Sequence, residues 1–238
     1  MKLSILMPVY NEETRLERAL KQALGVTYPC EIELVVVDDG STDSTSDILH
    51  RADDPRLRSI THPSNQGKGA AIRTAVQHAT GTHMVILDAD LEYDPLDIPG
   101  LLKPVLDGDP DTVVYGNRTF GSHSSFSFWY VQGNKAVTTF ANILFNCYLS
   151  DLETCFKLMP IDLYHSLNIR SKGFGMEAEV TGKLLRRGIR PYEIPIAYRA
   201  RTREEGKKIT WRDGVEALWI LVRERLRKPP RQPASSRS

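Results

Sequence analysis

Three acidic side chains stand at alternate positions of one short segment, Asp88-Ala89-Asp90-Leu91-Glu92. In an extended backbone, alternate side chains project from the same side, so these carboxylates are expected to converge. Mg²⁺ and Mn²⁺ prefer oxygen ligands, and Mg²⁺ commonly takes one or two carboxylates and fills its remaining positions with water and substrate phosphate. The segment therefore favours a divalent-cation site.

The spacing excludes one other function for this acidic segment and leaves two open. A calcium-binding EF-hand loop is excluded, because Tyr93 stands sixth from Asp88, where that loop requires glycine, and no Glu stands twelfth. An aspartyl nucleophile of the phosphatase type stays open, although such a residue more naturally follows an N-terminal strand. A solvated acidic turn stays open as well.

A second pair of carboxylates, Asp38 and Asp39, ends an apolar run. Adjacent carboxylates repel each other, so the pair indicates a ligand that donates hydrogen bonds, and a nucleobase edge is such a ligand. Tyr10, which follows an earlier apolar run, is placed to flank a base or ribose. Ser41 or Thr42 is expected to cap the next helix, but capping does not explain the two carboxylates.

Two glycines flank a lysine in the segment Gly67-Lys68-Gly69, which opens a helical pattern. The segment is not a P-loop, because the spacing GxxxxGK[ST] is absent. A helix N-terminus with exposed N–H groups and an adjacent lysine still predicts an anion site.

The elements that must position these motifs alternate along the first half of the chain. Short β-branched runs alternate with helical periodicity, which is typical of βαβ units and a largely parallel sheet. Strands are expected over residues 3–9, 31–38, 57–61, 83–87, 112–116 and 192–198, and helices over 12–24, 68–79, 177–187 and near the C-terminus. Ligands of such sheets bind beyond the carboxyl ends of the strands, where the motifs stand.

Charge is distributed unevenly along the chain. The 31 basic and 30 acidic residues give a net charge of +1, yet residues 199–238 hold 12 Lys and Arg against 5 Asp and Glu. The final helix carries an apolar stripe of Val215, Leu218, Trp219, Val222 and Leu226, with Arg223, Arg225, Arg227 and Lys228 clustered at its end. Such a helix either packs its stripe against the domain or lies on an anionic membrane surface.

Composition limits the class of protein. A chain of 238 residues with 41% hydrophobic and 26% charged residues can bury the core of one α/β domain. Three cysteines at irregular spacings indicate neither a disulfide framework nor a zinc site, which favours a reducing cytoplasm. No apolar run approaches the roughly 20 residues of a spanning helix, so we expect at most peripheral membrane contact. Residues 229–238 are expected to be a disordered tail.

Several motifs occur in an order and spacing that resemble a known family. They are PVYNE (8–12), VVVDDGSTD (35–43), NQGKGAAI (65–72), LDADLE (87–92), YGNR (115–118), SDLETCFK (150–157), GFGME (173–177) and RTREEGKK (201–208). Together they resemble the nucleotide-diphospho-sugar transferases of the GT-A fold. More narrowly, they are similar to the family 2 enzymes related to dolichol-phosphate mannose synthase and bacterial polyprenyl-phosphate glycosyltransferases.

The resemblance implies a domain plan. It covers roughly residues 3 to 227 and implies the GT-A fold, an α/β architecture with a mostly parallel twisted sheet flanked by helices. A single catalytic domain would span residues 1–228, with a nucleotide- and metal-binding half at 1–117. The acceptor half, 118–228, would end in the amphipathic basic helix.

The resemblance also implies roles for individual residues. The nucleotide would be held by Pro8, Tyr10, Glu12, Asp39, Lys68, Asp88 and Ala89, and Mg²⁺ or Mn²⁺ by Asp88, Asp90 and Glu92. The catalytic set would be Asp90, Arg118, Asp151, Arg201 and Lys208, the three basic residues facing phosphate groups. Asp151 and Glu153 match an acidic motif that borders the sugar pocket, and many relatives have Gln in place of Glu92.

The activity implied is an inverting transfer of one sugar from a UDP- or GDP-linked donor to a polyprenyl phosphate, at the inner face of the membrane. A lipid monophosphate is already an anionic nucleophile and needs no general base, whereas a hydroxyl acceptor does. Three alternatives stay open: a hydroxyl acceptor in a cell-envelope saccharide, a nucleotidyltransferase that makes the sugar nucleotide, and a non-catalytic, lipid-tethered binding module. No nucleic-acid partner is expected.

Overall fold

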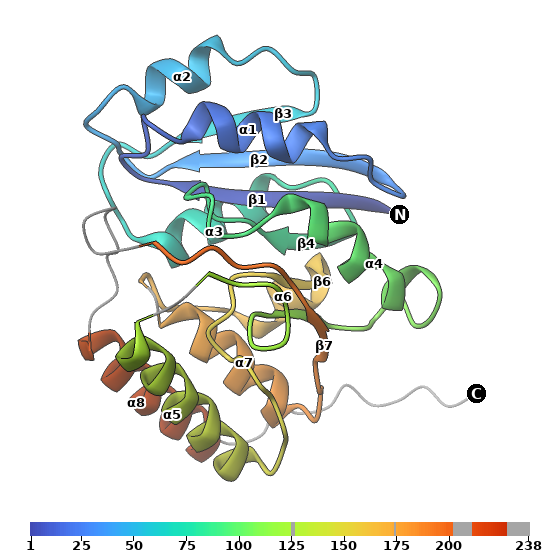
Figure 1. Cartoon of the computed structure of the whole chain (residues 1–238), viewed down its shortest axis with the longest axis vertical. Coiled ribbons are helices and arrows are strands. Elements are labelled where there is room, and N and C mark those ends of the chain that lie inside the picture. The colour runs from blue at the N-terminus through green and yellow to red at the C-terminus, as the bar shows by residue number, and fades with distance from the viewer. Residues whose placement is uncertain (125–126, 174, 202–210, 228–238) are drawn as a thin grey trace.

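A computed structural model describes residues 1–124, 127–173, 175–201 and 211–227. Within these residues seven strands form one sheet in the order β3-β2-β1-β4-β6-β5-β7 (Figure 1). The strands are β1 (Lys2–Val9), β2 (Glu31–Asp38), β3 (Leu57–Thr61), β4 (His83–Ile86), β5 (Val114–Asn117), β6 (Lys157–Pro160) and β7 (Tyr192–Pro195). The expected strands are thus present, the last two of them displaced or shortened by one to three residues.

The sheet is mostly parallel, as expected. β1, β2, β3 and β4 pair in parallel, and so do β5 and β7, whereas β6 is antiparallel to both of its neighbours. The central strands are buried along nearly their whole length, which explains their continuous apolar runs. The sequence did not predict β6.

This topology brings distant segments to one edge of the sheet. Because β6 is antiparallel to β4 and β5, it begins at the edge where those two strands end. The carboxyl ends of β1, β2, β4, β5 and β7 and the segment that precedes β6 therefore meet at this edge, which is where a ligand is expected in an open α/β sheet.

Helices flank the sheet on both sides (Figure 1). They are α1 (Leu16–Gly25), α2 (Thr45–Arg51), α3 (Lys68–His78), α4 (Ile98–Leu106), α5 (Phe128–Phe145), α6 (Ile161–Leu167), α7 (Met176–Arg186) and α8 (Trp211–Leu226), with a short 3₁₀ turn η1 (Pro95–Asp97). α1 begins four residues later than expected, because a turn closed by the Glu12 carbonyl precedes it. The 18-residue helix α5 was not predicted from its mixed aromatic and polar sequence.

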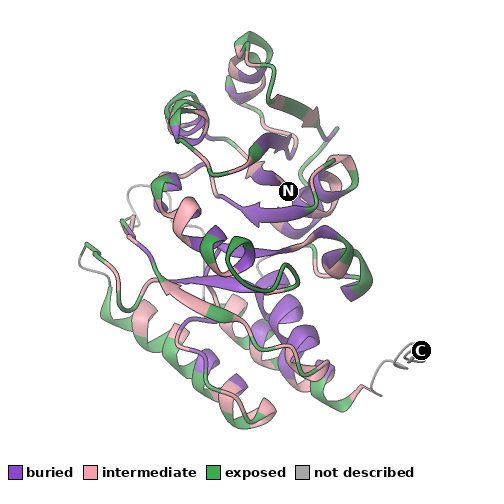
Figure 2. Ribbon diagram, turned by 90° about the vertical axis from the view of Figure 1, so that its right-hand side faces the viewer, coloured by how far each residue is buried: buried purple, intermediate pink, exposed green. Residues whose placement is uncertain are grey.

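A second, smaller core joins α5, α7 and α8 below the sheet. It contains Val137, Ala141, Leu152, Ala178, Ala217, Ile220 and Leu221. The buried side chains of α8 thus differ from the predicted stripe, in which Val215, Trp219 and Leu226 are 56%, 61% and 79% exposed. Figure 2 shows the central strands buried in the interior and exposed surface on the outer helices. Among the described residues, no helix has the length and apolar character needed to cross a bilayer.

Candidate functional site

The acidic segment after β4 is a turn. Residues 89–90 form this turn, and Leu91 has a left-handed backbone (φ 63°), which costs a residue with a side chain about 1–2 kcal/mol. The extended backbone expected for this segment is therefore wrong. Asp90 and Glu92 nevertheless stay close, since both contact the guanidinium of Arg201. Burial raises the pKa of Asp90 to about 7, and the charges of Asp88 and Glu92 add to this rise.

Arg201 joins two of these carboxylates. Its guanidinium lies 2.7 Å from Asp90 Oδ2 and 3.3 Å from Glu92 Oε1, and its backbone N–H donates to the same Glu92 oxygen at 2.9 Å. The other oxygen of Glu92 accepts the Tyr198 hydroxyl at 2.5 Å, and Glu12 lies 3.6 Å from the guanidinium. Glu92 thus anchors the segment that follows β7.

Lys68, at the start of α3, binds the first carboxylate of the segment. Its Nζ lies 2.9 Å from Asp88 Oδ2 and 3.0 Å from Glu177 Oε1 of α7. Burial alone would lower the pKa of Lys68, but the carboxylates of Asp88 and Glu177 hold it well above its usual value. Among the described residues, no three His, Cys, Asp or Glu side chains are placed to hold a metal ion as they stand.

The start of α3 differs from the expected anion site. The N–H groups of Gly69 and Ala70 donate to the Lys172 carbonyl at 2.7 and 3.3 Å, so they are not directed at a ligand. A Cβ on Gly69 would lie 2.3 Å from the Ser171 carbonyl oxygen. This glycine therefore allows α3 to pack against residues 171–172.

The two carboxylates after β2 have separate donors. Asp39 Oδ1 accepts from His62 Nδ1 at 2.7 Å and from the Gln66 N–H at 2.9 Å, and Oδ2 accepts the Gly67 N–H at 2.7 Å. One acceptor position of Oδ2 remains for a further donor. Asp38 Oδ1 accepts the Ser41 N–H, while its buried Oδ2 has no hydrogen-bond partner among the described residues.

The loops that follow β1 and β2 are tied to each other. The Asn11 N–H donates to Ser41 Oγ at 2.9 Å, and Asn11 Oδ1 accepts the Thr42 N–H at 2.8 Å. Ser41 and Thr42 are thus cross-links between loops, and the prediction that they cap the next helix is wrong, since α2 begins at Thr45. Nearby, Tyr10 and Pro8 are half-buried, and Ala89, after β4, is buried.

Arg118 and Asp151 form a buried bidentate pair. Arg118 Nε and Nη2 donate to the two Asp151 oxygens at 2.6 and 2.8 Å, and Asn134 of α5 donates to Oδ1 at 2.9 Å. Burial alone would raise the pKa of Asp151, but Arg118 holds it below its usual value. Asp151, which is 1% exposed, therefore orients Arg118 through these hydrogen bonds. The guanidinium of Arg118 also lies 5.0 Å from the centre of the Tyr198 ring.

Glu153 differs from Asp151 in having a buried oxygen without a partner. Its Oε1 has no hydrogen bond among the described residues, and neither has Oε2 of Glu177. Burial and the Glu177 carboxylate raise the pKa of Glu153 to about 7. Lys157, fully buried beside them, donates to the carbonyls of Leu152 and Thr154.

The structure thus brings the sequence-predicted residues into one charged network, which consists of two neighbouring groups of ion pairs: Lys68 with Asp88, and Arg201 with Glu12, Asp90 and Glu92. Arg118, which is paired with Asp151, adjoins this network through Tyr198: Arg118 lies over the Tyr198 ring, and the Tyr198 hydroxyl donates to Glu92. Lys208 lies outside the described residues, as do residues 203 and 207 and the tail at 229–238. Sequence reasoning missed Tyr198, His62 and Asn134, whose contacts come from distant segments and leave no local signal.

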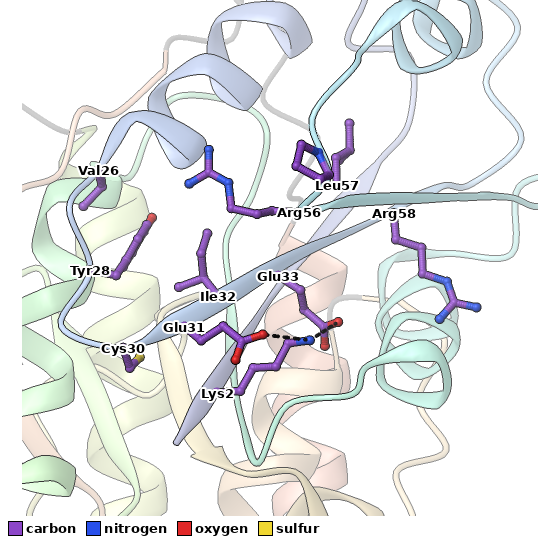
Figure 3. A pocket seen from close by; sticks show the side chains of 11 residues that line it. Lys2, Val26, Tyr28, Cys30, Glu31, Ile32, Glu33, Arg56, Leu57 and Arg58 are labelled. Atoms are coloured by element: carbon purple, nitrogen blue, oxygen red, sulfur yellow. Dashed lines mark ion pairs between the residues drawn. The ribbon is translucent and has the colours of Figure 1, made fainter.

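A cavity of about 530 Å³ lies at the opposite edge of the sheet (Figure 3). It is lined by residues at the amino ends of β1, β2 and β3, and Lys2 forms ion pairs there with Glu31 and Glu33 at 3.6 and 3.4 Å. None of the candidate site residues lines this cavity, so the cavity and the charged network are separate features.

Comparison with known families and relatives points to one class of enzyme. Residues 4–166 match the profile of Glycosyl transferase family 2. The low-salt glycan biosynthesis hexosyltransferase Agl6 of Haloferax volcanii is 28% identical over 85% of this chain and 49% of its own length. An uncharacterized glycosyltransferase of Haemophilus influenzae is 31% identical over 67% of this chain and 60% of its own.

A third relative is the undecaprenyl-phosphate 4-deoxy-4-formamido-L-arabinose transferase of Salmonella paratyphi B, 34% identical over 45% of this chain and 34% of its own length. The chain thus spans between a third and three fifths of these curated relatives. Among solved structures, glucosyl-3-phosphoglycerate synthase of Mycobacterium tuberculosis, in complex with Mn²⁺, UDP and phosphoglyceric acid, superposes with a TM-score of 0.73 at 20% identity, over 94% of this chain and 78% of that one. This likeness shows that the fold is GT-A.

Proposed function

The chain belongs to glycosyl transferase family 2, and we propose that this glycosyltransferase moves one sugar, with inversion, from a nucleotide-diphosphate sugar to a polyprenyl monophosphate. Residues 1–117 would bind the nucleotide and metal, and residues 118–228 the acceptor. One observation carries the proposal: carboxylates and cations for two phosphate groups meet at the carboxyl edge of the sheet. The name of one relative supports the acceptor.

In the proposed reaction, a phosphate oxygen of the acceptor attacks the anomeric carbon of the donor sugar. The bond from that carbon to the nucleotide diphosphate breaks, and the diphosphate leaves with the electron pair. Arg118 and Arg201 would bind the phosphate groups, since guanidinium forms bidentate contacts with phosphate oxygens. Asp151 would keep Arg118 in place through its two hydrogen bonds.

A divalent cation fits the donor set of this site. Asp88, Asp90 and Glu92 offer hard oxygen ligands, and burial, together with the charges of Asp88 and Glu92, raises the pKa of Asp90 by more than Arg201 lowers it. Mg²⁺ or Mn²⁺ held by these residues would neutralise the leaving diphosphate. Similar solved structures contain Mn²⁺ or Mg²⁺ with UDP. Tyr10 and Asp39, after β1 and β2, would hold the nucleoside.

A hydroxyl acceptor is the second candidate, and Glu153 favours it. Such an acceptor needs a general base, and a carboxyl with a pKa of about 7 and an unpartnered oxygen suits that role. Asp151 does not suit it, because Arg118 and Asn134 occupy its oxygens. The acceptor assay below separates the two candidates.

The outer faces of α5 and α8 would contact the membrane. Trp129 and Ile143 of α5 and Trp219 of α8 are exposed, and Arg223 stacks 5.0 Å from the Trp219 ring. Amphipathic helices with basic and aromatic residues bind at the surface of anionic bilayers. This contact would place the enzyme at the cytoplasmic face of the membrane, where a lipid-linked phosphate is presented.

The decisive test offers a panel of radiolabelled UDP- and GDP-sugars with Mg²⁺ or Mn²⁺ and undecaprenyl phosphate, and measures label extracted into organic solvent. We expect one donor to give a lipid product that mild acid cleaves, as expected of a sugar phosphodiester. Asp90→Ala should abolish transfer at saturating metal while the circular dichroism spectrum stays unchanged. No lipid-extractable product with any donor would overturn the proposal, and release of pyrophosphate would indicate a nucleotidyltransferase.

A further inference from the structure

The guanidinium of Arg201 lies between acidic groups from two separate loops. It contacts Asp90 at 2.7 Å and Glu92 at 3.3 Å, and Glu12, after β1, at 3.6 Å. Its side chain is only 15% exposed. The carboxylates of Asp90 and Glu92 are thus joined by the guanidinium of Arg201, a cation that belongs to the chain itself.

From this geometry we propose that Arg201 competes with the divalent cation for Asp90 and Glu92, and that its guanidinium leaves them when the ion binds. The inference rests on the proposed function, since it assumes that these carboxylates are metal ligands. An ion between the two oxygens would occupy the space that the guanidinium now fills, and two cations at that separation repel each other. Arg201, once displaced, is available to the donor phosphates.

Lys68 explains why Arg201 is the group that moves. Both cations bind a carboxylate of the acidic turn, but Lys68 has a second short contact, 3.0 Å to Glu177, that persists when Asp88 turns to an ion. Among the residues that the structure describes, the guanidinium of Arg201 would then keep only the 3.6 Å contact to Glu12. The two cations of the turn therefore respond differently: Lys68 stays and Arg201 is released.

The first test measures Mn²⁺ affinity by electron paramagnetic resonance of free Mn²⁺, without substrate, at pH 8. Arg201→Gln should bind Mn²⁺ about tenfold more tightly than the wild type, because no ion pair must be broken. Arg201→Lys, which keeps the charge, should stay within about threefold of the wild type. Arg15→Gln is the matched control, because Arg15 contacts Glu12 at 3.4 Å but is bound to neither Asp90 nor Glu92.

A second measurement follows Arg201 directly in the wild-type protein and uses a variant only to assign its signal. In a ¹H–¹⁵N spectrum of arginine Nε–H groups, the Arg201 signal is assigned by its absence from Arg201→Lys. Titration with Mg²⁺ should shift this signal and leave that of Arg118, paired with Asp151, within its linewidth.

The outcomes separate the two proposals. The proposal that Arg201 competes with the ion is overturned if Arg201→Gln binds Mn²⁺ as well as or more weakly than the wild type, or if Mg²⁺ does not shift the Arg201 signal. Either result leaves the proposed metal site intact. Absence of Mn²⁺ binding in every variant overturns the metal site itself, and with it the competition.

Discussion

Asp151 is a buried acid whose oxygens are all engaged. It accepts two hydrogen bonds from the guanidinium of Arg118, one from the Arg118 backbone N–H and one from Asn134. A buried charge whose partner is removed is left without compensation, which costs about 3–5 kcal/mol. The pair therefore links stability to the position of Arg118, the side chain that we propose binds phosphate.

Replacement of Asp151 by Asn tests this link. Because the charge of Arg118 loses its partner, Asp151→Asn should lower the free energy of unfolding by about 3 kcal/mol and reduce transfer at least 100-fold. Urea unfolding measures the first effect and the lipid-extraction assay the second. Asp107→Asn, at an exposed position, is the control and should change neither. A stable, active Asp151→Asn would show that Arg118 needs no such partner.

Glu153 links stability to pH. Its folded pKa of about 7 exceeds the ordinary 4.5, so between these values the folded chain binds more protons than the unfolded chain. The free energy of unfolding therefore falls as pH rises from about 4.5 through 7. Glu153→Gln should make this slope shallower, leaving the part that comes from the raised pKa of Asp90, and should stabilise the protein at pH 8 by on the order of 2 kcal/mol.

Melting temperatures of the wild type and Glu153→Gln between pH 5 and pH 8 measure this slope, with the exposed Glu31→Gln as control. Parallel curves for wild type and variant would contradict the raised pKa. The same variant separates the acceptors, because it should retain transfer to a lipid phosphate and lose transfer to a hydroxyl.

At the scale of elements, the start of α3 depends on a close approach to residues 171–172. Gly69 has no room for a Cβ, whereas Gly100, inside α4, has none of its neighbours within 4 Å of that position. Alanine favours a helix over glycine by about 1 kcal/mol when there is space.

The two glycines thus form a matched pair of substitutions. Gly69→Ala should lower the free energy of unfolding by about 2 kcal/mol, because α3 must move away from the Ser171 carbonyl, and should weaken nucleotide-sugar binding through Lys68. Gly100→Ala should be neutral or stabilising by up to about 1 kcal/mol. Chemical denaturation compares the two, and equal effects would show that the contact at Gly69 relaxes freely.

At the scale of the whole molecule, the charged network and the exposed helix faces occupy different parts of the surface. α5 and α8 lie side by side at the end of the molecule farthest from α2 (Figure 1). α8 buries Ala217, Ile220 and Leu221 and leaves Trp219 and Leu226 exposed next to basic residues. The second core thus fixes which face of α8 is available to a partner.

Membrane contact is tested on that face. The double variant Trp219→Ala/Leu226→Ala should reduce co-sedimentation with phosphatidylglycerol vesicles at least fivefold, because it removes apolar area that would enter the interface. Leu96→Ala is the control, since Leu96 is 68% exposed and lies on η1, which packs against α1 and α4. Binding should also weaken between 50 and 500 mM salt, about the range over which surface charges are screened. Equal sedimentation of all three proteins would exclude this face.

The mostly parallel sheet and the position of the acidic and basic motifs could be predicted from the sequence, because burial of parallel strands leaves continuous apolar runs and strand ends are marked by polar residues. Its prediction of an extended acidic segment was wrong, because Leu91 adopts a left-handed backbone that the ion pairs of Glu92 and Arg201 hold in place. The antiparallel strand β6 was not predicted from the sequence.

Which charged side chains meet could not be predicted from the sequence, because it depends on how the strands are ordered in the sheet. Arg201 reaches Asp90, and Asp151 reaches Arg118, across contacts that depend on strand order and not on local pattern. The apolar periodicity of α8 likewise could not say which face is buried, because all its faces carry apolar residues and the choice depends on how α5 and α7 pack against it.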